Sequence, residues 1–462
     1  MTETAPHGST TADAVLEALA EGLSEGALSK DSAELSAARA DRSGKIADGA
    51  PIAVVHAQSI EDVQLVMRVA SARGIPVVPR GAGTGLAGAA IAGENTISLS
   101  LLRMNRILEV NAADQLAVVE PGILNATLNE QLEPHGFWWA PDPASRSIST
   151  VGGNIATNAG GLLCAKYGVT REAVLGLDVV LPDGELLRLG HRTVKGVTGY
   201  DLAALMIGSE GTLGIVVGAT LKLRPLVPGE LWTIGAEFPD EQSAAEACAA
   251  VTAARIRPAV MELIGSVGIG LLASYTDTTL QGAFVLLQTD DNDGEQTARA
   301  AAEVLERFGA KVELTSDHER SAHLAEARRQ MMPAMEAAGN VLVEDVAVPR
   351  SRMAEMFAFC NDVGARYGVT VSTVAHAGDG NLHPAFVFDD AEPTEAVWQA
   401  ADEIFTKAIA LGGTLTGEHG VGTLKSRWLR DELGDVQYEL QRRIKAAFDP
   451  QGIMNPGKVF GA

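Results

Sequence analysis

The sequence predicts an α+β protein with more than one domain. Its 462 residues are too many for a single hydrophobic core of ordinary size. Between residues 51 and 224, short apolar runs alternate with glycine-rich turns, and between 226 and 425, strand-like runs alternate with helices rich in Ala and Glu. Such an order indicates layers of sheet and helix in at least two domains.

Elements are expected in four successive parts of the chain. Residues 1–45 form an N-terminal helical segment, since 11–40 are rich in Ala, Leu and Glu. The first domain, 46–225, is expected to hold strands at 52–57, 75–80, 95–101 and 115–122 and a crossover helix at 59–74. The second, 226–425, is expected to hold strands at 231–238, 282–289 and 371–378 and helices at 240–254 and 295–309. The last part, 426–462, is expected to be a helix stopped by Asp449-Pro450 and then an extended strap.

Composition excludes several classes of protein. Lys and Arg total 36 against 59 Asp and Glu, and the formal net charge of −23 repels nucleic acid and anionic lipid. No apolar run is long enough to span a bilayer, and the N-terminus lacks the regions of a signal peptide, so we expect a cytoplasmic protein. Three widely spaced cysteines argue against a disulfide framework or an iron–sulfur cluster held by this chain: Cys164, Cys248 and Cys360.

The stretch HAGDGNLHP (376–384) places two histidines around a Gly-Asp-Gly-Asn turn. Glycines make a helix unlikely here, and the flanking residues are rich in Val and Phe, so the segment is predicted to be strand, turn, strand. His376 would then leave one strand and His383 enter the next, with both rings near the mouth of one hairpin. Convergent imidazoles suggest a metal, provided that a third ligand exists.

A glycine loop, PVVPRGAGTGLAGAA, contains Gly83-x-Gly85-x-x-Gly88. This match to the dinucleotide fingerprint is weak, because a turn and a strand follow it where the fingerprint needs a helix. Its backbone N–H groups can still cradle a pyrophosphate, whereas the alternative, a tight strand-to-strand turn, rarely needs so many glycines. The residues of this cradle are Arg80, Gly81, Ala82, Gly83, Thr84 and Gly85.

Two more blocks support a bound cofactor: STVGGNIATNAGG (149–161) and GYDLAALMIGSEGTLGIV (199–216). Each mixes Gly with Ser, Thr or Asn, whose side chains bond ribityl hydroxyls and ring heteroatoms while the small residues admit a flat ring. Either block alone could be an ordinary loop. Three such blocks in one domain make that alternative improbable.

Six blocks in this order resemble the flavin-linked D-2-hydroxyacid dehydrogenases of the vanillyl-alcohol oxidase superfamily: PRGAGTGLAG, PDPASRSISTVGGNIATNAGG, VKGVTGYDLAALMIGSEGTLGIV, HAGDGNLHP, GEHGVG and IMNPGK. That group includes D-lactate dehydrogenases, the flavin subunit of bacterial glycolate oxidase and D-2-hydroxyglutarate dehydrogenase. The resemblance implies an FAD-binding domain, a substrate cap domain with an antiparallel sheet, and a C-terminal strap that returns to the flavin. Some members of the superfamily attach FAD through a histidine in the glycine loop, and since residues 77–100 contain none, we expect a non-covalent flavin. Besides the cradle, the implied flavin-binding residues are Leu86, Gly152, Gly153, Asn154, Asn158, Gly160, Glu210, Gly211, Gly214, Ile215 and Asn455.

The motif GEHGVG (417–422) supplies the missing ligand. Two histidines and a carboxylate are a common set for a borderline divalent cation, so His376, His383 and Glu418 are expected to bind zinc, with manganese or iron as alternatives. The resemblance implies the same ligands. His419 is left as the base, in a glycine-flanked loop, whereas His318 and His323 are interpreted as ordinary surface histidines.

The implied reaction is oxidation of a D-2-hydroxy acid to the 2-oxo acid, an oxidoreductase reaction at a CH–OH group. The metal would lower the pKa of the hydroxyl, His419 would take its proton, and hydride would pass to flavin N5. Arg328 matches the family's substrate-binding arginine and would bind the carboxylate. The alternative is that Arg328 and Arg329 are both solvent-facing charges of a helix, of which adjacent residues point about 100° apart.

Specificity and partners are less constrained by the sequence. Hydroxyglutarate enzymes carry a threonine four residues after this arginine and a lysine near the next strand, where this chain has Met332 and NVLVEDV, which favours a monocarboxylate such as D-lactate or glycolate. A hydroxyglutarate-type enzyme and a flavin subunit of a multi-subunit glycolate oxidase stay open as alternatives. So do a zinc hydrolase, an ether-lipid synthase-like flavoprotein and a non-catalytic flavin subunit. The electron acceptor is left open between a quinone, a cytochrome, an electron-transfer flavoprotein and a separate iron–sulfur subunit, and through its acceptor the protein could lie at the periphery of a membrane. A homodimer is compatible with the sequence.

Overall fold

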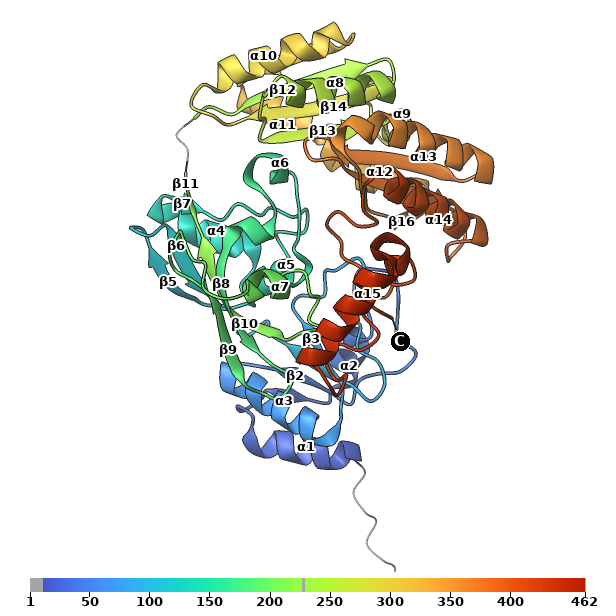
Figure 1. Cartoon of the computed structure of the whole chain (residues 1–462). Coiled ribbons are helices and arrows are strands. Elements are labelled where there is room, and N and C mark those ends of the chain that lie inside the picture. Colours follow the sequence, from blue (N-terminus) through green and yellow to red (C-terminus); the bar gives the residue numbers. More distant parts are fainter. Residues whose placement is uncertain (1–10, 227–228, 462) are drawn as a thin grey trace, which may run out of the picture. The chain divides into compact units, whose positions relative to one another are not determined.

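The structure is a computed structural model that describes residues 11–226 and 229–461 (Figure 1). Within these ranges the chain forms two compact units. Among the described residues, the first unit consists of 11–159, 170–225 and 419–461, and the second of 160–169, 226 and 229–418. Mixed helix and sheet in each unit confirm the predicted α+β class.

A four-stranded sheet of the first unit carries the glycine loop. Its order is β1-β2-β4-β3, in which β2, β4 and β3 are parallel and β1 is antiparallel to β2. Helices α1 and α3 lie side by side (Figure 1) and pack their apolar residues with those of β2 and β4. The elements are α1 (Thr11–Gly22), β1 (Leu28–Ser29), α2 (Ser32–Ala38), β2 (Ala53–His56), α3 (Ile60–Arg73), β3 (Val77–Arg80) and β4 (Ile97–Ser100).

Helix α3 ends as its sequence requires. Ser59 caps its first turn, because the side chain accepts a hydrogen bond from Asp62 N. Gly74 stops it in the left-handed conformation, with φ of 66°, which glycine adopts without steric cost. Strand β3 follows this turn, and the parallel strand β4 follows after the glycine loop.

A five-stranded antiparallel sheet completes the first unit in the order β5-β6-β10-β8-β9. Its core includes Trp139, Leu128 and Ile155, so that α4 and α5 cover its strands. The strands are β5 (Ile107–Asn111), β6 (Leu116–Val119), β8 (Val174–Val180), β9 (Leu186–Gly190) and β10 (Ile215–Lys222), with β7 (Phe137–Trp138) and β11 (Arg224–Pro225) as a separate pair. The helices are α4 (Asn125–Leu132), η1 (Glu133–His135), α5 (Val151–Thr157), η2 (Thr170–Ala173), α7 (Leu202–Met206) and α15 (Leu429–Phe448).

The second unit is built on one eight-stranded antiparallel sheet. The order is β15-β12-β14-β13-β18-β19-β16, and β17 also pairs with β19. The strands are β12 (Trp232–Phe238), β13 (Val260–Ile264), β14 (Ala283–Thr289), β15 (Lys311–Thr315), β16 (Asn340–Val343), β17 (Val346–Ala347), β18 (Thr370–His376) and β19 (Asn381–Phe388).

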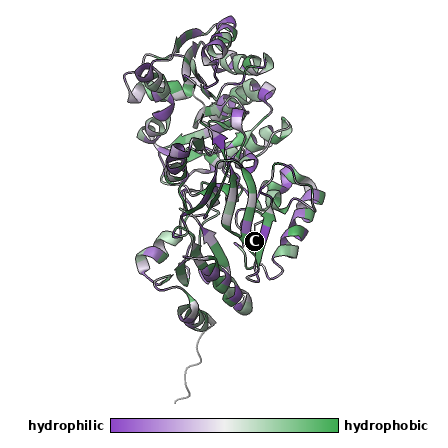
Figure 2. Ribbon diagram, turned by 90° about the vertical axis from the view of Figure 1, so that its left-hand side faces the viewer, coloured by the Kyte–Doolittle hydropathy of each residue, from purple (hydrophilic) through white to green (hydrophobic). Residues whose placement is uncertain are grey.

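Helices cover this sheet on both faces. Those on one face, α9, α11 and α12, pack on Ile264, Phe284 and Val374. On the other face, α8 packs between α10 and α13, and α14 packs against α13. The helices mix hydrophilic and hydrophobic residues (Figure 2), as amphipathic helices on a sheet should. Their bounds are α6 (Cys164–Tyr167), α8 (Glu241–Ala253), α9 (Ser266–Tyr275), α10 (Gly294–Arg307), α11 (His318–Arg329), α12 (Met331–Ala338), η3 (Arg350–Arg352), α13 (Met353–Tyr367) and α14 (Glu395–Ala410).

Candidate functional site

The predicted hairpin is formed by β18 and β19. His376 pairs with Asn381 and Val374 with His383 in its register. Directly paired residues share a face of a sheet, as do residues two apart in one strand, so both histidines project from the same face. Their ring centroids are 5.0 Å apart, with the rings nearly perpendicular.

Glu418 meets both imidazoles. Its Oε1 lies 3.5 Å from His376 Nε2 and 3.2 Å from His383 Nε2. One ligand atom from each of the three residues lies within 4.8 Å of the others. The structure therefore brings together the set that the sequence assigned to a metal.

Two carboxylates that the sequence analysis missed stand behind the histidines. Glu262 Oε1 lies 2.6 Å from His376 Nδ1, and Asp345 Oδ1 lies 4.0 Å from His383 Nδ1. Asp345 also accepts hydrogen bonds from Thr416 Oγ1 and from Glu418 N, at 2.7 and 3.0 Å. Metal-binding histidines usually present their second nitrogen to such a partner. The available signal was an acidic residue inside an otherwise apolar run, VMELI or VLVEDVAV.

The electrostatics of this cluster suit a cation. Glu262 and Asp345 are buried, the Glu418 side chain is 12% exposed, and Arg328 pairs with Glu262. Burial favours neutral Glu418, but hydrogen bonds from the two imidazoles outweigh it and hold the pKa of Glu418 well below its usual range. Burial likewise disfavours charged His376, yet Glu262 and Glu418 raise its pKa well above the usual range. The carboxylates thus draw a proton onto an imidazole, and a divalent cation could supply the same positive charge.

The neighbouring arginines take different positions. Arg328 Nε donates to Glu262 Oε2 at 2.8 Å, and the arginine side chain is 26% exposed. Arg329 pairs instead with Glu326 on the surface of α11 and is 54% exposed. Of the two, Arg328 is the one bonded to Glu262, the carboxylate that also contacts His376. Met332 is exposed on α12.

The glycine loop follows β3 and contains no helix before β4. Arg80 turns inward, where Nη1 donates to Ala40 O and Ala90 O, both at 2.9 Å. Gly83 has φ of 69°, and a Cβ there would overlap the Arg80 guanidinium. A Cβ at Gly81 would overlap Thr150 Oγ1, so the first two glycine blocks touch. The Arg80 side chain therefore shapes the loop, which also contains Ala82, Thr84, Gly85 and Leu86.

The second block forms α5 and its cap. Thr150 caps the helix through Gly153 N. Asn154 is buried, and its Nδ2 has no hydrogen-bond partner in the part of the chain that the structure describes. Asn158 ends the helix with φ of 51° and accepts from Arg171 N at 3.0 Å. At Gly152 a Cβ would come within 2.5 Å of Pro121 Cβ.

The third block is fastened by a buried carboxylate. Glu210 accepts hydrogen bonds from Val421 N and Gly422 N, each at 2.8 Å. Burial raises the pKa of Glu210 to about 7, against the effect of these two bonds. Asn455 Nδ2 donates to Glu210 O at 2.8 Å and to Ala89 O at 3.0 Å, which fixes the C-terminal strap to the glycine blocks. Gly211 and Gly214 lie between α7 and β10, and Ile215 is the first residue of β10.

Gly160, predicted to bind the flavin, and His419, predicted to be the base, lie next to Glu418 in space or in sequence. Gly160 groups with the second unit, where an added Cβ would lie 2.7 Å from Glu418 Oε2, so a side chain there would crowd the carboxylate. His419 is the first residue of the last segment of the first unit and directly follows Glu418 in the chain.

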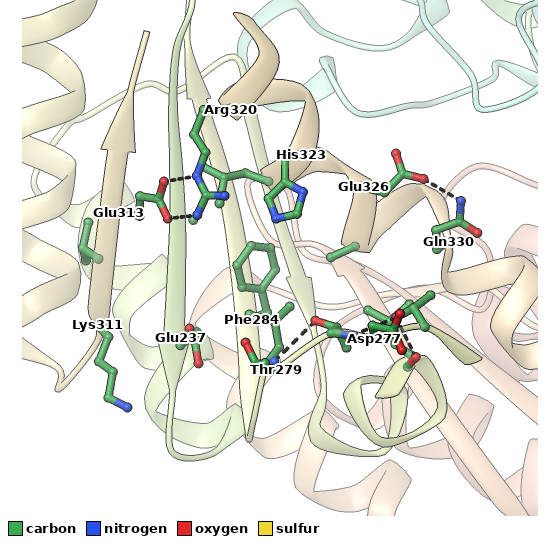
Figure 3. Close-up of a pocket in the computed structure, with 18 residues that line it drawn as sticks. Glu237, Asp277, Thr279, Phe284, Lys311, Glu313, Arg320, His323, Glu326 and Gln330 are labelled. Carbon is green, nitrogen blue, oxygen red and sulfur yellow. Dashed lines mark hydrogen bonds and ion pairs between the residues drawn. The ribbon is translucent and has the colours of Figure 1, made fainter. Parts of the chain in front are cut away.

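A separate cavity of about 490 Å³ lies in the second unit beside α11 (Figure 3). Phe284 and Leu324 contribute apolar surface, and an Arg320–Glu313 ion pair lines one side. Its lining includes the exposed His323 but neither the histidine pair nor Arg328. Both histidines interpreted as surface residues, His318 and His323, are exposed.

Two families match the chain in succession. Residues 51–190 match the FAD binding domain family, and residues 228–459 match the family described as FAD linked oxidases, C-terminal domain. A glycolate oxidase subunit GlcD of Bacillus subtilis is 39% identical over 89% of both chains. A D-lactate dehydrogenase of Anaerostipes hadrus is 36% identical over 88% of this chain and 89% of its own.

Solved structures share the fold. p-Cresol methylhydroxylase with bound substrate aligns with a TM-score of 0.80 over 98% of both chains, at 19% identity. An alkyldihydroxyacetonephosphate synthase aligns with a TM-score of 0.74 over 96% of this chain and 84% of its own, also at 19% identity. Among the residues that the structure describes, no helix is both long and apolar enough to cross a membrane.

Proposed function

Since the chain belongs to the FAD-linked oxidases, we propose that it oxidises a D-2-hydroxy acid, preferably a monocarboxylate such as D-lactate or glycolate, to the 2-oxo acid. The relatives named as glycolate oxidase subunits and D-lactate dehydrogenases support this substrate class. The observation that carries the proposal is the convergence of His376, His383 and Glu418, because a 2-hydroxy acid offers two oxygens to a cation held there.

The residues of the first unit suit a non-covalent flavin. Gly81 and Gly83 keep side chains out of the loop. Buried polar atoms of the second glycine block and of the C-terminal strap lack partners among the described residues: Ser149 Oγ, Asn154 Nδ2 and Asn455 Oδ1. These atoms are donors and acceptors of the kind that a flavin needs. The backbone of residues 80–86 and the side chain of Asn154 are the parts that we propose to contact FAD.

The cation site is supported by its donor set. His376 and His383 would each offer Nε2, and Glu418 an oxygen, while the opposite nitrogens of the imidazoles face Glu262 and Asp345. When bound, the flavin supplies a hydride acceptor and the cation a Lewis acid that lowers the pKa of the substrate hydroxyl. Zinc fits this set best, and manganese or iron could replace it.

The chain's own residues then have three tasks. The metal ligands orient the substrate, Arg328 pairs with its carboxylate, and His419 accepts the hydroxyl proton. Met332, in place of a polar residue near Arg328, leaves a second carboxylate without a partner and favours a monocarboxylate.

An anaerobic titration tests the proposal. The purified yellow protein is mixed with D-lactate, glycolate, D-2-hydroxyglutarate and the L-enantiomers, and flavin absorbance is followed. Bleaching by a D-2-hydroxy monocarboxylate is expected. A flavin that no 2-hydroxy acid bleaches would contradict the proposal, and faster bleaching by hydroxyglutarate would reverse the choice of substrate.

The acceptor of the electrons is part of the same proposal. Relatives carry the name of a glycolate oxidase subunit, which suggests that a partner protein takes the electrons. A quinone, a cytochrome, an electron-transfer flavoprotein and an iron–sulfur subunit remain the candidates, and such a partner could bring the chain to a membrane surface.

A further inference from the structure

One carboxylate contacts two functional side chains at once. Glu262 Oε1 lies 2.6 Å from His376 Nδ1, and Glu262 Oε2 lies 2.8 Å from Arg328 Nε. The Glu262 side chain is 1% exposed. It is the charged residue in a strand, β13, that is otherwise apolar and buried.

The backbone builds one of these contacts. Glu262 is paired directly with His376 between β13 and β18, so both side chains leave the same face at neighbouring positions. Arg328 reaches the same carboxylate from α11. The two carboxylate oxygens of Glu262, in β13, thereby connect β18 with α11.

Burial of this charge needs a reason beyond stability. The Glu262 side chain is 1% exposed, and a buried carboxylate is costly unless hydrogen bonds satisfy it, as those with His376 and Arg328 do here. Replacing a buried ion pair by apolar residues is often neutral or stabilising. The presence of Glu262 in an apolar strand is therefore better explained by its orientation of His376 and Arg328 than by a contribution to the free energy of folding.

Each oxygen fixes one partner. A carboxylate at Nδ1 selects the tautomer of His376 that is protonated there and leaves Nε2 as the metal-binding atom. The bond to Nε holds one edge of the Arg328 guanidinium and leaves the pair of terminal nitrogens, which has no other partner among the described residues, for a carboxylate.

We propose that Glu262 is a positioning residue that couples cation binding at His376 to recognition of the substrate carboxylate by Arg328. This inference rests on the proposed function of the same site. It assigns to one side chain the alignment of the two groups that would hold opposite ends of a 2-hydroxy acid.

Asp345 provides a matched control within the chain. It is placed behind His383 as Glu262 is placed behind His376, but it accepts hydrogen bonds from Thr416 and from the Glu418 backbone. Among the described residues, the Arg328 guanidinium is bonded to Glu262 and not to Asp345. Loss of Asp345 should therefore weaken the cation site without changing the arginine.

The test uses the FAD-loaded protein and the variants Glu262→Gln, Asp345→Asn and Arg328→Ala. Zinc affinity is measured by competition with a chromophoric chelator, and carboxylate affinity by the change that propionate, which lacks the hydroxyl, causes in the flavin spectrum at saturating zinc. We expect both Glu262→Gln and Asp345→Asn to weaken zinc binding on the order of 10- to 100-fold. Glu262→Gln alone of these two should also weaken propionate binding, on the order of tenfold.

A double variant decides whether the effect passes through the arginine. If Glu262 acts by orienting Arg328, Glu262→Gln should add little to the loss of propionate affinity already caused by Arg328→Ala. Additive losses, or unchanged propionate binding in Glu262→Gln, would overturn the coupling. If the Gln variant does not fold, Glu262→Asp, which keeps the charge but is too short to bridge both partners, should show the same double loss.

The outcome also separates this inference from the proposed function. Wild-type protein that binds neither zinc nor propionate would overturn both. Wild-type protein that binds both ligands, with a Glu262→Gln variant of equal affinities, would overturn only the role of Glu262.

Discussion

Gly83 and Gly85 lie two residues apart in the same loop, yet a side chain would meet different surroundings at each. At Gly83 a Cβ would overlap Arg80 and would need a left-handed backbone, so a substitution disturbs the protein itself. At Gly85 the nearest atom to an added Cβ is Asp41 Oδ2 at 3.9 Å. Gly85 is therefore the position at which a side chain can block a ligand without disturbing the loop.

We expect Gly85→Val to fold normally but to purify with little FAD, because the branched side chain obstructs the approach of a pyrophosphate. Flavin content is measured from the absorbance ratio, and folding by circular dichroism. Gly83→Val should lose both flavin and stability. Full flavin occupancy in Gly85→Val would show that the loop does not contact the cofactor.

His419 is the residue that we propose as the base. His419→Ala should keep FAD, zinc and substrate binding but lower the rate of flavin reduction on the order of 10²- to 10⁴-fold, the usual contribution of a positioned base. The rate is measured by anaerobic stopped flow at saturating substrate. Reduction at a near wild-type rate would transfer this role to another group.

Glu210 makes the stability of the first unit depend on pH. Its folded-state pKa of about 7 lies above the usual 4.5, so the folded state binds the proton more tightly than the unfolded state does. This contribution is fully present below about pH 4.5 and is lost as the pH rises through about 7. The loss corresponds to about 3 kcal/mol by linkage.

The prediction compares flavin-free wild type with Glu210→Gln, which has no charge to lose. The free energy of unfolding of wild type, relative to the variant, should fall between pH 5 and pH 8, as measured by urea denaturation. A constant difference over this range would mean that the Glu210 carboxylate does not titrate there. Wild type and variant are measured at the same pH. The contributions of all other titratable groups to the free energy of unfolding are common to both proteins and cancel in the difference.

At the scale of elements, the hairpin of β18 and β19 was predictable and its surroundings were not. A Gly-Asp-Gly-Asn turn between apolar runs specifies a hairpin locally, and Ser59 and Gly74 are local signals that bound α3. Glu262 reaches His376 through the pairing of β13 with β18, which are far apart in sequence, and no local pattern encodes that pairing. The three residues proposed as metal ligands could be assigned because their motifs are short, whereas the carboxylates behind them depend on strand order.

The hairpin also sets the expectation for metal removal. Because its histidines and Glu418 belong to the second unit and the glycine blocks that we propose to bind FAD belong almost wholly to the first, a chelator should abolish reduction by substrate while the flavin stays bound. His383→Ala should reproduce this loss, and His323→Ala, an exposed residue of α11, should not. Zinc content and flavin absorbance are measured on the same samples. Undiminished reduction in metal-free protein would exclude the metal from the reaction.

At the scale of the whole molecule, the net charge of −23 acts on every charged reactant that approaches. A large negative charge attracts cations and repels anions, and dissolved salt screens both effects. The electron acceptor is the reactant for which this matters most, since we propose that a local arginine and a cation bind the substrate. The charge thus bears on the identity of the acceptor, which the fold leaves open.

Two small metal complexes of opposite charge test whether the net charge controls the approach of an electron acceptor to the flavin. The flavin is first reduced with dithionite, so that the result does not depend on the substrate, and is then reoxidised by hexaammineruthenium(III), a trivalent cation, or by ferricyanide, a trivalent anion. Raising the ionic strength from about 0.01 M to about 0.15 M shortens the screening length from roughly 30 to 8 Å. The second-order rate constant should therefore fall for the cation and rise for the anion. If the rate constant instead rose for the cation and fell for the anion, the field at the flavin would be positive despite the net charge, and a local basic patch would have to guide the acceptor.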